Sequence, residues 1–382
     1  MNFELSDEQQ QLADSLSKYL NNEYGFEQRK AILQSPSGLS DKAWAAFAEM
    51  GLTAIALPEA DGGFGGGATD LMAPMEAFGE ALVVEPVLDN VALAGRLVAK
   101  LGSAAQRAAM LPGLIDGSAQ LAFACYEPGQ RYALNASTTV AQQNGTGWTL
   151  NGAKCVVVGA ATASALVVSA NTGGKGGIGG TGGTSVSLFV VDPKAAGVSL
   201  NPSRTVDGQR VADVRFTGVV LGNDALLGAP GTALPAIEEA VDFATALLCA
   251  EAVGAMKFAN DATLEYLKTR KQFGVPIASF QVLQHRMVEM YIHTEQARSM
   301  AILAANRVDA GGDAKERQRA VSAAKVKIAD AARVVSQESV QLHGGMGMTE
   351  ELKISHTFRR LTMAAQRFGD ADHHLERYAA LT

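Results

Sequence analysis

The chain has 382 residues, 47% of them hydrophobic and 19% charged, a composition that indicates a folded globular protein and excludes a disordered one. Its formal net charge of −7 argues against nucleic acid as a partner, although local arginines and helix N-termini can still hold phosphate groups. The sequence contains no apolar run of about 18 residues and begins with no basic, apolar leader, so we expect no membrane span and a cytoplasmic protein.

The first part of the chain has the periodicity of helices. Ser6 and the three residues after it form a capping signal ahead of Leu12, Leu16 and Leu20, which recur at helical spacing. A glycine-dense turn then precedes an apolar-periodic helix expected from about residue 69 to 82. We therefore predict an N-terminal all-α domain over residues 1–118.

Near residue 120 the pattern changes to short segments rich in β-branched residues, separated by turn signals such as Asn144-Gly. Strands are expected at 121–125, 138–142, 148–150, 155–158, 165–168, 186–191 and 214–216. This pattern predicts a middle β domain over residues 119–230, built as an antiparallel barrel or sandwich. Glycine dominates residues 171–183, which we interpret as a mobile surface loop that can be shortened without loss of the fold.

Helical periodicity returns after about Gly231, with long helices expected at 233–268, 280–308 and 314–342. We assign residues 231–382 to a C-terminal helical domain, so the predicted fold class is α+β and multidomain. Cys125, Cys155 and Cys249 stand far apart in apolar surroundings with no metal-ligand spacing, which favours reduced, structural thiols.

Two segments of the C-terminal part carry a family resemblance. Residues 269–281 read TRKQFGVPIASFQ and residues 341–347 read QLHGGMG. Together with the order of all-α, β and all-α regions, they resemble the acyl-CoA dehydrogenase family over essentially the whole chain. The resemblance implies an N-terminal helical domain, a middle β-barrel and a C-terminal four-helix bundle. It also implies an FAD-dependent oxidoreductase that acts on the α,β carbon–carbon bond of an acyl-CoA thioester in fatty acid or steroid catabolism.

In the family, the first of these segments reaches the diphosphate and adenosine of an FAD bound mainly by the neighbouring subunit. An arginine suits this role because its guanidinium fork pairs with two phosphate oxygens at once. Glycines suit the second segment because a backbone without Cβ atoms lets a ligand approach closely. The residues that the resemblance implies are Arg270, Gln272, Phe273 and Gln281 in the first segment, and Gln341, Gly344 and Gly345 in the second.

The middle region departs from the family pattern. Glu127-Pro128 is retained, but the Trp-Ile-Thr that covers the flavin ring in the family aligns with Val156–Val158. The aromatic lid and its hydroxyl are therefore absent from the sequence. The resemblance still implies contacts to the flavin ring from the backbone N–H groups of Cys125, Tyr126 and Val158.

The usual catalytic glutamate is also replaced. The family's Glu-Gly-Thr aligns with Phe368-Gly369-Asp370, and its alternative glutamate position aligns with Ala244. Abstraction of the α-proton needs a carboxylate near the substrate, which leaves three hypotheses: Asp370 is the base, Asp242 is the base, or this chain supplies none. Asp370 is also a good N-cap for the helix that follows it. No metal site is expected, because the sequence shows no second cluster of ligand residues to complement Asp370 and the nearby histidines.

Four possibilities stay open at this stage. The chain is a catalytic acyl-CoA dehydrogenase, a flavin-binding subunit without its own base, a flavin oxidase or monooxygenase on the same fold, or a purely structural protein on that fold. The segment from Phe358 to His374 most resembles the small subunits of two-component acyl-CoA dehydrogenases of the pimeloyl-CoA or steroid side-chain type. The expected partners are an acyl-CoA substrate and either a second copy, in a homodimer or homotetramer, or a related subunit in a heterotetramer.

Overall fold

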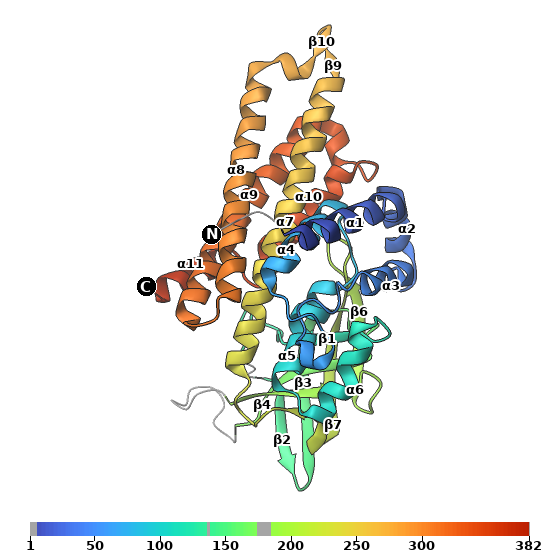
Figure 1. Ribbon diagram of the computed structural model, residues 1–382, viewed down its shortest axis with the longest axis vertical. Helices are drawn as coiled ribbons and strands as arrows, with labels where there is room; N and C mark the ends of the chain where they lie inside the picture. The colour runs from blue at the N-terminus through green and yellow to red at the C-terminus, as the bar shows by residue number, and fades with distance from the viewer. Residues whose placement is uncertain (1–5, 136–137, 174–184, 382) are drawn as a thin grey trace. The chain divides into compact units, whose positions relative to one another are not determined.

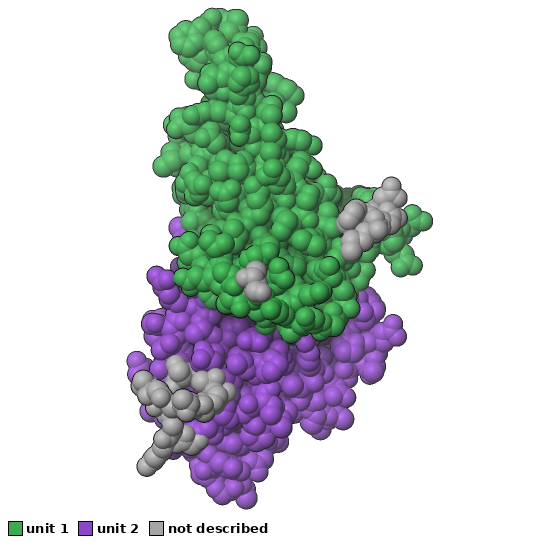
Figure 2. All heavy atoms as spheres, turned by 90° about the vertical axis from the view of Figure 1, so that its left-hand side faces the viewer, with its two compact units in different colours: residues 1–35, 67–83, 245–382 green, residues 36–66, 84–244 purple. Residues whose placement is uncertain are grey.

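The computed structural model describes residues 6–135, 138–173 and 185–381 (Figure 1). The predicted glycine-rich loop at 171–183 therefore lies outside the described residues from position 174 onward. The chain divides into two compact units, coloured separately in Figure 2: residues 1–35, 67–83 and 245–382 form unit 1, and residues 36–66 and 84–244 form unit 2. No helix of the described residues is long and apolar enough to cross a membrane.

Unit 1 joins N-terminal helices to the C-terminal bundle. Its N-terminal helices are α1 (Asp7–Glu23), α2 (Phe26–Gln34) and α4 (Ala68–Ala81). The predicted start of α1 is confirmed, because the Ser6 side chain accepts a hydrogen bond from Gln9 N. The Asp309 carboxylate accepts hydrogen bonds from Ala68 N at 2.7 Å and Thr69 N at 2.8 Å, so a side chain distant in sequence stabilises the N-terminus of α4.

The predicted long helices of the C-terminal part are confirmed to within two residues: α7 (Leu234–Thr269), α8 (Gln281–Asp309) and α9 (Ala314–His343). The shorter α10 (Lys353–Gln366) and α11 (Ala371–Ala380) follow them. Helices α4 and α7 cross where each has a glycine. A Cβ on Gly79 would lie 1.8 Å from Glu251 O, and one on Gly254 would lie 1.8 Å from Glu76 O, so only glycine permits this approach.

Unit 2 contains α3 (Asp41–Glu49), the π-helix η2 (Leu88–Gly95), α5 (Arg96–Leu101), α6 (Ala104–Ile115) and a sheet. The strands are β1 (Leu121–Ala124), β2 (Val140–Asn144), β3 (Gly147–Val158), β4 (Ala165–Asn171), β5 (Val186–Val191), β6 (Val198–Arg204), β7 (Arg210–Gly222) and β8 (Leu226–Leu227). Within the described residues they form one eight-stranded sheet in the order β6-β7-β3-β2-β4-β5-β8, with β1 pairing in parallel to β4.

The strand predictions need several corrections. The strand expected at 214–216 is the longer β7, β2 begins two residues later than expected, and β8 was not predicted. The strands expected at 148–150 and 155–158 are one strand, β3, because it stays paired with β7 across the residues between them, with two register shifts. The sheet is not wholly antiparallel, since β1 and a single position of β2 pair in parallel with β4. Strand β6 was not predicted, because most of its side chains face solvent and its apolar alternation is limited to Val198 and Leu200.

Candidate functional site

A short hairpin joins α7 to α8 and carries the arginine of the first segment. Strands β9 (Lys271–Gln272) and β10 (Val275–Pro276) pair, and Ile277 N donates to Arg270 O to close the hairpin. Figure 1 shows β9 and β10 at the far ends of the two long helices. The Arg270 side chain is exposed and forms no ion pair or hydrogen bond within the described part of the chain. It is therefore a cation left available for a ligand.

The hairpin also holds Phe273 in an unusual conformation. Its φ is +54°, in the left-handed region that non-glycine residues avoid, and its side chain is 91% exposed. Its ring makes an edge contact with Phe280, the centroids lying 6.1 Å apart. A strained, exposed aromatic side chain supports a contact outside the chain. The two glutamines of this segment, Gln272 and Gln281, are likewise exposed.

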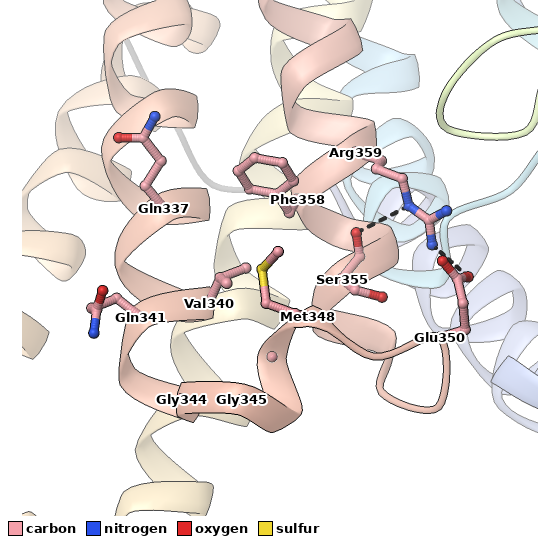
Figure 3. A pocket seen from close by; sticks show the side chains of 11 residues that line it. Gln337, Val340, Gln341, Gly344, Gly345, Met348, Glu350, Ser355, Phe358 and Arg359 are labelled. Carbon is pink, nitrogen blue, oxygen red and sulfur yellow. Dashed lines mark hydrogen bonds and ion pairs between the residues drawn. The ribbon is translucent and has the colours of Figure 1, made fainter.

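The second segment forms the wall of a cavity of about 640 Å³ (Figure 3). Helix α9 ends at His343, and Gly344, with φ +60°, turns the chain into the 3-10 helix η5 (Gly344–Met348). The predicted residues Gln341, Gly344 and Gly345 all line this cavity. The other lining residues are Gln337, Val340, Gly347, Met348, Glu350, Ser355, Phe358 and Arg359.

An aromatic stack joins the two segments. The Tyr266 ring on α7 lies parallel to the His343 ring on α9, with centroids 4.4 Å apart and an interplanar angle of 26°. Tyr266 stands one helical turn before Arg270, and His343 directly precedes Gly344. Sequence reasoning missed this pair, although the placement of an aromatic and a histidine beside the two motifs was visible. The stack brings the end of α7 that leads into the hairpin beside the glycine turn.

These residues fit an FAD diphosphate and adenosine. A Cβ on Gly344 or Gly345 would meet no atom within 4 Å, so both positions face open space and a ligand can approach the backbone there. Arg270 contributes an unpaired guanidinium, whose geometry matches phosphate oxygens. The site therefore offers two features that suit a nucleotide, a charged fork and a glycine backbone that a ligand can approach closely.

Substitution of Gly345 tests whether the cavity holds the cofactor. Because its backbone is not left-handed and its Cβ would meet open space, we expect Gly345→Ala and Gly345→Leu to fold with unchanged thermal midpoints. The leucine side chain would occupy the cavity, so FAD should bind about tenfold to a hundredfold more weakly in Gly345→Leu and nearly normally in Gly345→Ala. Fluorescence titration of the FAD-free protein measures this difference, and equal affinities in both variants would contradict the assignment.

In unit 2, a buried ion pair between Lys154 and Glu127 links β3 to the backbone near Cys125 and Tyr126, which the resemblance implies to contact the flavin ring. The Lys154 ammonium, fully buried on β3, donates to Glu127 Oε1 at 3.0 Å, to Cys125 O at 2.9 Å and to Ser169 Oγ at 3.0 Å. Cys155 N donates to Tyr126 O at 2.9 Å. The backbone around Cys125 and Tyr126 is thus joined directly to β3, the strand that ends at Val158.

This pair makes a pH-dependent contribution to stability. Burial alone would raise the pKa of Glu127, but the Lys154 charge and hydrogen bonds from Thr138 and Thr139 lower this pKa to about 2. The contribution is therefore complete above the ordinary glutamate pKa and is lost as the pH falls from about 4.5 toward 2.

Removal of one partner should destabilise the protein strongly. Lys154→Met leaves a buried, unpaired carboxylate, so we expect a loss of about 3–5 kcal/mol in the free energy of unfolding. The double variant Glu127→Gln/Lys154→Met buries no charge and should lose clearly less. Urea unfolding at neutral pH compares the two, and an equal loss in both would show that the charges do not stabilise each other.

At the position of the family's glutamate, the Phe368 side chain is 6% exposed and its φ is +61°. Asp370 caps α11, its Oδ1 accepting from His373 N at 2.9 Å, so the N-cap reading is confirmed. Asp370 also lines a second cavity, of about 700 Å³, beside α9 and α10. The buried Lys325 ammonium holds this loop by donating to Ala365 O at 3.0 Å and Gly369 O at 2.7 Å.

The other candidate base is buried. Asp242 on α7 is fully buried, as is Ala244 at the family's alternative glutamate position. The three cysteines are free thiols, as predicted, although Cys155 is only half-buried. Among residues 6–135, 138–173 and 185–381, no group of three His, Cys, Asp or Glu side chains is placed to hold a metal ion.

Family models for the N-terminal, middle and C-terminal domains of acyl-CoA dehydrogenases match residues 6–118, 122–219 and 234–380. The acyl-CoA dehydrogenase FadE12 of Mycobacterium tuberculosis is 32% identical over 355 residues, which cover 92% of this chain and 89% of that protein. The chain belongs to the acyl-CoA dehydrogenase family. Another acyl-CoA dehydrogenase, the human mitochondrial short-chain specific enzyme, is 28% identical over 324 residues, which cover 81% of this chain and 74% of that enzyme.

Solved structures of acyl-CoA dehydrogenases agree with this assignment. A variant of the Tcur3481-Tcur3483 steroid ACAD superposes with a TM-score of 0.86 at 28% identity, covering 98% of this chain and 97% of that chain. A glutaryl-coenzyme A dehydrogenase complex superposes with a TM-score of 0.90 at 23% identity, covering 99% of this chain and 96% of that chain, and so shares the fold. The predicted acyl-CoA dehydrogenase fold is confirmed, and membership of this flavoprotein family supports FAD as the cofactor.

Proposed function

We propose that this chain is an FAD-dependent acyl-CoA dehydrogenase, an oxidoreductase for the α,β carbon–carbon bond of acyl-CoA thioesters in fatty acid or steroid catabolism. The observation that carries the proposal is the cavity that Gln341, Gly344 and Gly345 line together, next to the Tyr266–His343 stack that leads to Arg270. The proposal includes the division into three domains at residues 1–118, 119–230 and 231–382.

Each group of residues has a distinct role in this proposal. The guanidinium of Arg270 and the ring of Phe273, with Gln272 and Gln281, would hold the diphosphate and adenosine of FAD together with the cavity residues. The backbone N–H groups of Cys125, Tyr126 and Val158 would contact the flavin ring. FAD, when bound, supplies the acceptor for the β-hydride. The protein binds and orients both molecules and takes up the α-proton.

Asp370 is the proposed base. It is a carboxylate two residues beyond the position of the family's glutamate, and it lines a cavity. A side chain that accepts a proton must come within hydrogen-bonding distance of the substrate, at about 2.6–3.2 Å. Since Asp370 Oδ1 accepts from His373 N in this conformation, the carboxylate would turn from its cap to the substrate.

A second function is favoured by one specific observation. A buried phenylalanine occupies the glutamate position, and the nearby aspartate is engaged as a helix cap. This combination suits a flavin-binding subunit that works in a heterotetramer with a related, glutamate-bearing acyl-CoA dehydrogenase subunit. The names of two structural relatives support such an assembly: the Tcur3481-Tcur3483 steroid ACAD, and the ChsE4-ChsE5 complex of Mycobacterium tuberculosis, which is 24% identical and shares the fold.

Anaerobic titration distinguishes these functions. The purified chain is mixed with acyl-CoAs of short-chain, dicarboxylic and steroid side-chain type while the flavin absorbance is followed, with and without candidate partner subunits. Bleaching by the chain alone establishes the catalytic function, and bleaching only with a partner establishes the two-component function. A coloured protein that no acyl-CoA bleaches, in any combination, would refute both. The native mass separates a homodimer or homotetramer from a heterotetramer.

A further inference from the structure

Strand β3 contains a bulge next to the segment assigned to the flavin ring. Lys154 pairs with Val214 on β7, but the next paired position is Val157 with Ala212, so β3 has one residue more than β7 over this stretch. Val156 lies within the bulge with φ +53° and a side chain that is 51% exposed. A β-branched residue in the left-handed region is a true outlier, which some other group must hold in place.

The anchor is a carboxylate on the neighbouring strand. Asp213 Oδ1 accepts a hydrogen bond from Val156 N at 3.1 Å, which captures the N–H group that the bulge removes from the ladder. On the preceding residue, Cys155 N donates to Tyr126 O. The bulge is thus held by a backbone carbonyl at one residue and by a side chain at the next.

The charge of Asp213 also acts on the neighbouring Cys155 thiol. Burial raises the pKa of this thiol, and the negative charge of Asp213 raises the pKa further. Asp213 itself is exposed on the outer side of β7, where its neighbour across the sheet on β6 is Asn201. Because Asp213 is exposed, it adds little to the packing of the core, and its hydrogen bond from Val156 N is the contact through which it can act on the bulge.

We propose that Asp213 is a positioning residue of the cofactor site, which locks the bulge and thereby fixes the backbone from Val156 to Val158. The inference rests on the proposed function, in which the Val158 backbone contacts the flavin ring. Backbone donors bind a ring well only when their geometry is set before binding. The aromatic lid of the family is replaced here by valine, so the backbone conformation carries more of the contact.

Three single substitutions and one double variant distinguish a positioning role from a general effect on stability. Asp213→Ala removes the acceptor, whereas Asp213→Asn keeps an oxygen that can accept from Val156 N. Val156→Gly removes the strain, because glycine adopts a positive φ without an anchor. Asp213→Ala should therefore bind FAD about tenfold more weakly, and Asp213→Asn should stay within about twofold of wild type. Adding Asp213→Ala to Val156→Gly should change the affinity less than about twofold.

Hydrogen exchange of the FAD-free protein observes the bulge directly. In Asp213→Ala, but not in Asp213→Asn, the peptide containing Val156 should exchange faster, while the thermal midpoint stays within a few degrees of wild type. Faster exchange with unchanged FAD affinity would refute the positioning role, and unchanged exchange would refute the lock. Equal loss of affinity in the Asp213→Ala and Asp213→Asn variants, or no rescue by Val156→Gly, would also overturn the inference. A wild-type chain that binds no FAD would instead refute the proposed function itself.

Discussion

Arg270→Ala is expected to purify as a folded but colourless protein. Arg270 is exposed at the end of α7, so its loss removes no packing from the core. If its guanidinium pairs with the FAD diphosphate, the change removes a charge-assisted interaction of about 2–4 kcal/mol, which is roughly a 30-fold to 1000-fold loss of affinity. The ratio of flavin to protein absorbance in the purified variant measures the effect.

Two matched variants sharpen this experiment. Arg270→Lys keeps the charge but loses the planar fork, so we expect FAD affinity between those of wild type and Arg270→Ala. Lys271→Ala removes an exposed cation from the adjacent residue of the same hairpin and should keep its flavin. Full FAD occupancy in Arg270→Ala, or an equal loss in Lys271→Ala, would contradict the role of Arg270.

Asp370→Asn is expected to slow flavin reduction by acyl-CoA at least about a hundredfold, the usual size of a general-base contribution. Asparagine is as good an N-cap as aspartate, so the variant should keep the hydrogen bond from His373 N and its stability. FAD and acyl-CoA binding should therefore remain near wild type. Stopped-flow measurement of flavin absorbance at saturating acyl-CoA reports the chemical step separately from binding.

The comparison with two further variants decides between cap and base. Asp370→Ala loses both the cap and the carboxylate. The lost cap should reduce the free energy of unfolding by about 1 kcal/mol, so the thermal midpoint should fall together with the rate of flavin reduction. Asp372→Asn neutralises a carboxylate that lines the same cavity and should leave the reduction rate unchanged. Wild-type bleaching by Asp370→Asn would exclude Asp370 as the base. Bleaching of the wild type only with a glutamate-bearing partner would assign the base to the partner subunit.

The elements that could be predicted share one property, a strong local pattern. Apolar residues at helical spacing placed α7, α8 and α9 within two residues of their observed ends, and Ser6 with Gln9 predicted the start of α1. Strand β6 was not predicted, because it lies at the edge of the sheet with most side chains in solvent and only Val198 and Leu200 alternate with polar residues. The bulge in β3 was not predicted, because it depends on pairing with β7, a strand more than fifty residues away.

The same division holds for the site. The sequence by itself indicated the family, because residues 269–281 and 341–347 are local motifs that resemble it, and that resemblance implied FAD and the residues proposed to hold it. It also showed that the usual glutamate is absent. Only the tertiary structure decided that Gln341, Gly344 and Gly345 share one cavity, that Tyr266 stacks on His343, and that Asp213 anchors Val156. These contacts join segments distant in the chain, and their formation depends on how the helices and strands pack rather than on any local pattern.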